Sequence, residues 1–337
     1  MILPSHVSFW QVLVPLAALL LSLGCERVPV GEGVVRKVED ARARNDAPAI
    51  WRVRDEDSTL YLFGTVHLLP DGLSWQHDDL RDAFAESGTV FFEADTSGAA
   101  GLRAQSLATQ RGLRRDGRRL TDILDGYQSK LLEAVANNGD IDLAALDAMQ
   151  PWLASEFLTL SAAEETGLAA ALSADEALKS RAMRAGKAVI YFETAEDQVR
   201  QMADLPEDVQ LELLTDTMER FDDIGAQLDR IARDWAVGDV DALERDLIGP
   251  MASAPDGFYQ TVFLDRNEAW ADRLDQFMGG SGTGLVAVGT GHLLGEGSLI
   301  DALESRGHEV RRYLAFLGED VIKPTVLDLP EVPTGDQ

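Results

Sequence analysis

Two stretches of this sequence, FGTVHLLPDG at residues 63–72 and VGTGHLLGEG at residues 288–297, align without a gap and share six of ten residues. Each follows an apolar run typical of a strand and precedes a helical pattern and a further strand. Two equivalent β-loop-α-β units are therefore expected in one sheet, which brings two Gly-Thr-x-His loops together. α/β folds bind ligands at the carboxyl ends of their strands, because the strands hold the backbone there while side chains stay exposed.

The rest of the chain fits around these two units. The predicted fold is α/β (α+β), a central mixed sheet built from two β-loop-α-β repeats that carry the Gly-x-x-His loops. Helix formers dominate about 100–185 and 195–275, which predicts a large helical insertion that forms a cap over the sheet. The domain is expected to span 49–316, followed by a loose C-terminal tail over 317–337. Strands are expected at 50–53, 59–64, 89–92, 187–192, 285–288 and 309–314, and repeat helices at about 75–86 and 296–306.

Composition excludes several classes of protein. A chain of 337 residues with 45% hydrophobic residues can bury a sizeable core, so disorder is excluded for most of it. Its 58 acidic residues against 30 basic ones give a net charge of −28. Nucleic acids would repel such a chain, so no nucleic-acid partner is expected.

The amino-terminal segment predicts a membrane tether. Residues 7–24 carry no formal charge, and the stretch LSLGC ends at Cys25, the only cysteine of the chain. Small and apolar residues before a lone cysteine resemble a bacterial lipobox, so 1–24 is interpreted as a lipoprotein-type signal peptide and Cys25 as the lipidated residue. Residues 25–48 then form a flexible tether that holds the domain at the cell envelope, outside the cytoplasm. A plain signal or anchor and a buried helix are the alternatives.

The repeated loops supply the first candidate site residues. His67 and His292 can each offer a neutral nitrogen to a metal or act as a base near pH 7. Two histidines make an incomplete divalent-metal site. Glu93 is the best carboxylate to complete it, because it ends the apolar strand at 89–92, which is expected to lie next to the strand of the first repeat. The alternatives are packing roles for the histidines and a structural ion pair for Glu93.

Other polar residues are secondary candidates. Glu193 repeats the strand-then-Glu arrangement, and Asp95 follows Glu93 at the point where the chain leaves the strand. Asn267 is a third secondary candidate, whereas Arg266 beside it is a candidate for the site itself, because arginine can bind a carboxylate or stabilise an oxyanion. Trp270 is expected to belong to the core, whereas His77 and His308 lack such a context and are expected at the surface.

In this order, Gly64-Thr-Val-His67, Phe92-Glu93, Glu193-Thr194, Arg266-Asn267 and Gly289-Thr-Gly-His292 resemble the TraB/PrgY/GumN family over roughly 48–316. That family is similar to the Tiki metal-dependent proteases and, more distantly, to erythromycin-esterase-like and ChaN-like proteins. The resemblance implies that His67, Glu93, Arg266 and His292 form the site, with His67, Glu93 and His292 on a divalent metal ion. Manganese or cobalt is what the family implies, and zinc stays open.

These residues predict a metal-dependent hydrolase of peptide or ester bonds, in which Arg266 stabilises the oxyanion. The expected partner is a peptide or protein substrate. The sequence contains no His-Glu-x-x-His, no Gly-x-Ser-x-Gly and no P-loop, so the common alternatives lose support. Two other hypotheses stay open. One is a lipoprotein that sequesters a peptide or haem-like ligand without turnover. The other is a metal-free hydrolase in which His67 or His292 is the general base and Glu93 is its partner.

Overall fold

The computed structural model describes residues 47–170, 173–252 and 257–313. The signal peptide, Cys25, nearly all of the tether and the C-terminal tail predicted above lie outside the described residues. Within the described part of the chain, no helix is both long and apolar enough to cross a membrane.

A six-stranded mixed sheet forms the centre of the molecule, as the sequence predicted. The strand order is β6-β4-β7-β2-β1-β8, and β1 is antiparallel to both of its neighbours. A separate pair is formed by β3 and β5. The strands are β1 (Ile50–Arg54), β2 (Ser58–Thr65), β3 (Leu69–Pro70), β4 (Thr89–Asp95), β5 (Leu168–Ala169), β6 (Ala188–Thr194), β7 (Gly282–Gly289) and β8 (Val310–Arg312).

The two repeats lie side by side. Strands β2 and β7 pair in parallel along their whole length, with Thr65 opposite Gly289, so both Gly-Thr-x-His loops leave the same edge of the sheet. The sequence had placed β4 beside β2, and this is wrong, because β7 lies between them. Residues Leu285 to Val288 of β7 are completely or almost completely buried. A strand this apolar is stable only with a neighbouring strand on each side. β7 obtains both by lying between β2 and β4.

Helices cover both faces of the sheet. The β2-to-β4 and β7-to-β8 connections run in opposite directions across it, so right-handed crossovers place their helices on opposite faces. Helix α7 lies beside α2, since the guanidinium of Arg181 is 4.2 Å from the ring centre of Phe84. Helix α13 packs on α14. Both α7 and α13 fall in the ranges expected for the cap, yet they contact the sheet. These four helices are α2 (Asp78–Glu86), α7 (Ala174–Arg184), α13 (Asp265–Met278) and α14 (Leu299–Ser305).

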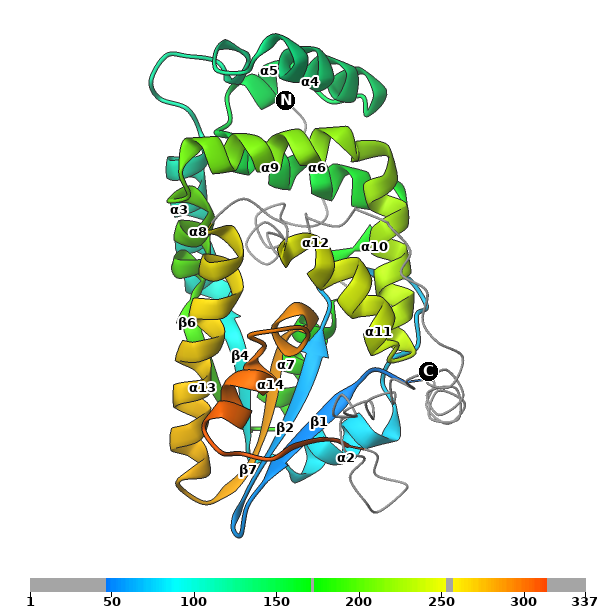
Figure 1. The fold of residues 1–337 in the computed structure, drawn as a ribbon, viewed down its shortest axis with the longest axis vertical. Helices are drawn as coiled ribbons and strands as arrows, with labels where there is room; N and C mark the ends of the chain where they lie inside the picture. Colours follow the sequence, from blue (N-terminus) through cyan, green and yellow to red (C-terminus); the bar gives the residue numbers. More distant parts are fainter. Residues whose placement is uncertain (1–46, 171–172, 253–256, 314–337) are drawn as a thin grey trace, which may run out of the picture.

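The other helices build a layer beyond the carboxyl end of β2 and along its sides (Figure 1). They pack mainly on one another, with α6 against α9 and α10, and α3 against α8. A short 3-10 turn at Leu120–Asp122 and a π-helical turn at Glu244–Ile248 lie between helices of this layer, and a second π-helical turn at Gln260–Leu264 leads into α13. The 3-10 turn at Thr290–Leu293 belongs to the second repeat loop. The helices are α3 (Gly98–Gly112), α4 (Gly126–Asn138), α5 (Leu143–Asp147), α6 (Pro151–Glu165), α8 (Ala195–Ala203), α9 (Glu207–Glu219), α10 (Phe221–Ala236), α11 (Val240–Leu243) and α12 (Gly249–Ala252).

One hydrogen bond ties the helical layer to the first repeat. The indole nitrogen of Trp235, on α10, donates to the carbonyl of Gly64 at 2.8 Å. The same indole packs against Phe63 and Trp75, with ring centroids 6.0 and 5.7 Å away. Leu68, Leu69, Leu293 and Leu294 are buried, so the residues after each histidine anchor both loops in the core.

A close approach between the repeats generates a stability prediction. A Cβ added at Gly64 would lie 2.7 Å from Oγ1 and 3.0 Å from Cα of Thr290. We expect Gly64→Ala to lower the free energy of unfolding by about 1–3 kcal/mol, because the backbone of the second loop would have to shift. Urea denaturation measures this effect. Gly88→Ala is the control, since its nearest atom would be 3.9 Å away, and equal stability of the two variants would contradict the prediction.

Candidate active site

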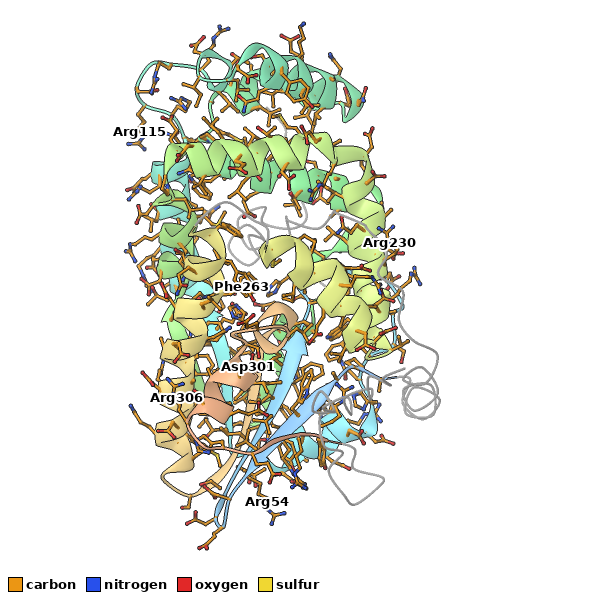
Figure 2. All side chains as sticks on the ribbon, in the orientation of Figure 1. Arg54, Arg115, Arg230, Phe263, Asp301 and Arg306 are labelled. Carbon is orange, nitrogen blue, oxygen red and sulfur yellow. The ribbon has the colours of Figure 1, made fainter. Side chains whose placement is uncertain are left out.

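The carboxyl ends of the central strands open into one pocket that contains all four residues predicted for the site. His67 and His292 come from the two repeat loops, Glu93 from β4, and Arg266 from the first turn of α13. The helical layer closes the pocket with apolar side chains. Figure 2 shows Phe263, one of these, between the sheet and the helices above it. The lining is Thr65, Val66, His67, Glu93, Gln198, Gln201, Met202, Ile231, Leu247, Val262, Phe263, Arg266, Gly289, Thr290, Gly291 and His292.

His67 is held by a carboxylate. Its Nδ1 lies 3.2 Å from Oδ1 of Asp175, in the first turn of α7. Burial alone would lower the pKa of His67, but the Asp175 carboxylate outweighs it and the pKa is raised above its ordinary value. Nε2 is the nitrogen turned toward the pocket, 3.7 Å from where a Cβ of Gly289 would lie. This side chain is therefore oriented through Nδ1, and no described residue is hydrogen-bonded to its Nε2.

His292 is buried and neutral. Its Nε2 lies 3.0 Å from Nη1 of Arg266, and because a guanidinium can only donate, Nε2 accepts. Nδ1 therefore carries the proton and donates to Oδ1 of Asn267 at 2.7 Å. The Asn267 amide is fixed in turn by donating to the carbonyl of Gly297 at 2.8 Å. Burial, together with the Arg266 charge, lowers the pKa of His292 to about 3.

Every N–H group of Arg266 has an acceptor. Nε and Nη2 donate to the two oxygens of Glu193 at 3.1 and 2.6 Å, and Nη2 also donates to Glu93 at 2.7 Å. Nη1 donates to the carbonyl of Val262, in the π-helical turn before α13, and to His292. The guanidinium lies 4.6 Å from the ring centre of Trp270, which is buried as predicted. No donor is left over in this arrangement, so the predicted role of Arg266 as oxyanion stabiliser would require the guanidinium to release one of these partners.

Glu93 is ionised, and each of its two oxygens accepts at least one hydrogen bond. Oε1 accepts from the backbone N–H of Gly289 at 2.6 Å, and Oε2 accepts from Gln198 at 3.0 Å as well as from Arg266. Burial would raise the pKa of Glu93, but the Arg266 charge, together with the hydrogen bond from the backbone of Gly289, lowers it to about 2. The pKa of Glu193 is raised because its burial outweighs the same guanidinium.

Asp95, the remaining secondary candidate, lies outside the pocket lining. The strand continues through Asp95, and its carboxylate accepts from the backbone and hydroxyl of Ser97 at the start of α3. His77 and His308 also lie elsewhere, half-buried beside Asp79 and Asp275. These contacts are consistent with local structural roles.

Sequence reasoning missed Asp175 and Gln198. Ser173 and Glu176 are typical of the first turn of a helix, which contains Asp175. No local signal relates this first turn to a histidine 108 residues away. Gln198 carries a further feature, since its Oε1 is buried without a hydrogen-bond partner among the described residues. Oγ1 of Thr65, on another wall of the pocket, is in the same state. Both atoms are available to a ligand or to water.

The predicted metal-ligand set does not fit the residues as placed. Among the described residues, no three His, Cys, Asp or Glu side chains are grouped so as to hold an ion. The reason is local, because Nε2 of His292 and Oε2 of Glu93 are both bonded to Arg266. Nε2 of His67 and Oε1 of Glu93 do face one space, 3.7 and 3.1 Å from a Cβ position at Gly289. Two donors are fewer than the three protein ligands of a typical catalytic zinc site.

The TraB/PrgY/gumN family pattern matches residues 49–312, so the chain belongs to this family. Uncharacterized protein YbaP of Escherichia coli (strain K12) is 25% identical over 252 residues, 75% of this chain and 90% of that protein. Its Shigella flexneri counterpart, also named as uncharacterized, is 25% identical over 239 residues, 71% of this chain and 85% of that protein. No solved structure gives a significant match. The family predicted from the motifs is confirmed.

The buried state of His292 predicts a pH dependence of stability. Its pKa is about 3 when folded and about 6.5 in an unfolded chain, so between these values the unfolded state binds one more proton. His292 therefore makes the protein less stable as pH falls below 6.5, by up to about 1.4 kcal/mol per pH unit. Urea denaturation of wild type and His292→Gln between pH 7 and 4.5 measures this. The stability difference between them should narrow as pH falls, and a constant difference would contradict the assignment.

Proposed function

We propose that this protein is a hydrolase of acyl bonds, in peptides first and esters second, with His67 as general base. The observation that carries the proposal is the contact of His67 with Asp175, which leaves Nε2 facing the pocket at 3.7 Å from the Gly289 Cβ position. His67 takes a proton from water as the water oxygen attacks the carbonyl carbon. The same proton then goes to the leaving nitrogen or oxygen as the acyl bond breaks.

The neighbouring residues hold this base and its substrate in place. Asp175 keeps the proton of neutral His67 on Nδ1, so that Nε2 is the basic nitrogen. Glu93 fixes the second repeat loop through the N–H of Gly289. The unpartnered Oε1 of Gln198 and Oγ1 of Thr65 can accept from an N–H and donate to a carbonyl, respectively. An amide group supplies both complements.

A metal-dependent form of the same reaction, with manganese, cobalt or zinc, is the second candidate. It is favoured by the shared space in front of His67 and Glu93, and by Asp175, since metal-bound histidines usually donate their other nitrogen to a carboxylate. In this form His67, Glu93 and His292 would hold the ion, and Arg266 would have to release His292. The ion would supply a Lewis acid and an activated water.

The proposal is tested by activity on a fluorogenic peptide library. Relative to wild type, we expect His67→Gln and Asp175→Asn to lower kcat by about 10²–10⁴-fold, because each removes the oriented base. The control is Glu176→Gln, next to Asp175 but bonded to Thr96 and Lys179. It should keep wild-type kcat.

The outcomes separate the candidate functions. Full activity after exhaustive chelation supports the metal-free form, whereas activity lost to chelation and restored by one ion supports the metal-dependent form. Peptide binding without turnover by wild type would contradict both and leave a sequestering protein. Wild-type kcat in His67→Gln would exclude His67 as the base.

We also propose that the chain is a lipoprotein of the cell envelope, anchored through Cys25 on the extracytoplasmic side of a membrane. The lipobox-like stretch LSLGC, residues 21–25, supports this. Wild type should incorporate an alkyne-labelled fatty acid in bacterial cells and sediment with membranes, because one acylated terminus tethers a domain. Cys25→Ser should lose the label, and equal labelling of both forms would contradict lipidation at this residue.

A further inference from the structure

We infer that the guanidinium of Arg266 is the resident cation of this pocket and occupies the place that the sequence assigned to a divalent metal ion. Two carboxylates and one imidazole surround it, from β4, β6 and the second repeat loop. These are the side-chain types that bind divalent ions in proteins. Here their lone pairs bind an arginine that the chain itself supplies.

Each N–H donor of the guanidinium is matched by one acceptor. Arginine has five N–H groups in one plane, and the structure gives them five contacts, at 2.6 to 3.1 Å. Four contacts go to Glu93, Glu193 and His292, and the fifth goes to the carbonyl of Val262. The side chain of Arg266 is only 9% exposed, so water cannot replace these partners cheaply.

A metal ion and this guanidinium exclude each other at His292. An imidazole has one lone pair when neutral, and Nε2 of His292 already uses it to accept from Arg266. The other nitrogen, Nδ1, holds the proton that binds Asn267. An ion at His292 would therefore have to displace Arg266 and leave a buried positive charge without its partners, which is strongly unfavourable.

Removal of the guanidinium would turn the same acceptors into a vacant cation site. In Arg266→Ala, Glu93, Glu193 and His292 would face the space that the side chain leaves, with two negative charges uncompensated. That space fits a free guanidinium ion, and its donor set suits a divalent ion. Arg266→Ala should therefore gain a binding property that wild type lacks. Arg273→Ala is the matched control, because Arg273 lies on the same helix but donates to the backbone carbonyls of Tyr191 and Phe192.

The experiment measures metal retention by the domain with manganese, cobalt or zinc as the probe. Each protein is incubated with one metal and desalted, and its metal content is then determined by elemental analysis. We expect no retained ion in wild type and Arg273→Ala, and about one ion per chain in Arg266→Ala. Millimolar guanidinium chloride, far below denaturing concentrations, should raise the melting temperature of Arg266→Ala and compete with the ion.

Wild type provides a test that does not depend on the variant folding. In ¹⁵N NMR, the His292 ring should show a protonated Nδ1 and an unprotonated, hydrogen-bonded Nε2, unchanged by zinc. A zinc-induced shift of Nε2, or an ion in wild type that His292→Gln loses, overturns the inference. A folded Arg266→Ala that binds neither a divalent ion nor guanidinium overturns it as well. None of these readouts depends on hydrolysis, so they stand apart from the metal-free form of the proposed function. An ion at His292 in wild type would overturn the inference and support the metal-dependent form.

Discussion

The organisation of the pocket depends on one buried cation. Arg266 binds Glu93 on β4, Glu193 on β6, His292 in the second repeat loop and the π-helical turn that precedes its own helix. A buried guanidinium is unfavourable unless its donors are satisfied, and buried carboxylates are unfavourable unless their charges are balanced. The contacts therefore fix the relative positions of four segments that are far apart in the sequence. They also set the neutral state of His292 and the ionised state of Glu93.

The duplicated loops consequently have different chemical states. His292 is 1% exposed, and both of its nitrogens are hydrogen-bonded, to Asn267 and Arg266. His67 contacts Asp175 through Nδ1 and keeps Nε2 toward the pocket. The same motif surrounds both histidines in the sequence, but their environments in the fold differ. His292 is a buried hydrogen-bond acceptor of Arg266, whereas Nε2 of His67 has no hydrogen-bond partner among the described residues. This asymmetry favours the proposed metal-free reaction at His67 over an ion bound between the two histidines.

Predictions from local patterns succeeded where one segment contains all the necessary information. The apolar runs gave β1, β2, β4, β6 and β7 within a few residues, because buried strands need such runs. Periodicity did not show the insertion of β7 between β2 and β4, since strand order depends on which partners bury β7 best. Asp95 follows Glu93 by two residues, yet its carboxylate binds Ser97, because the chain turns into α3 there. Asp175 was missed because only the packing of α7 brings it to His67.

The sequence by itself determined the family, the mixed sheet and the meeting of His67, Glu93, Arg266 and His292 at one edge. The sheet and the meeting of His67, Glu93 and His292 follow from a repeat and from strand ends, which are properties of short segments. The family and the place of Arg266 follow from the resemblance of the ordered motifs. Tertiary structure alone decided what each of these side chains does there. Proton positions and charge balance depend on distances between groups from different segments. The guanidinium of Arg266 lies at hydrogen-bond distance from three of the predicted or secondary ligands, and no spacing along the chain encodes that.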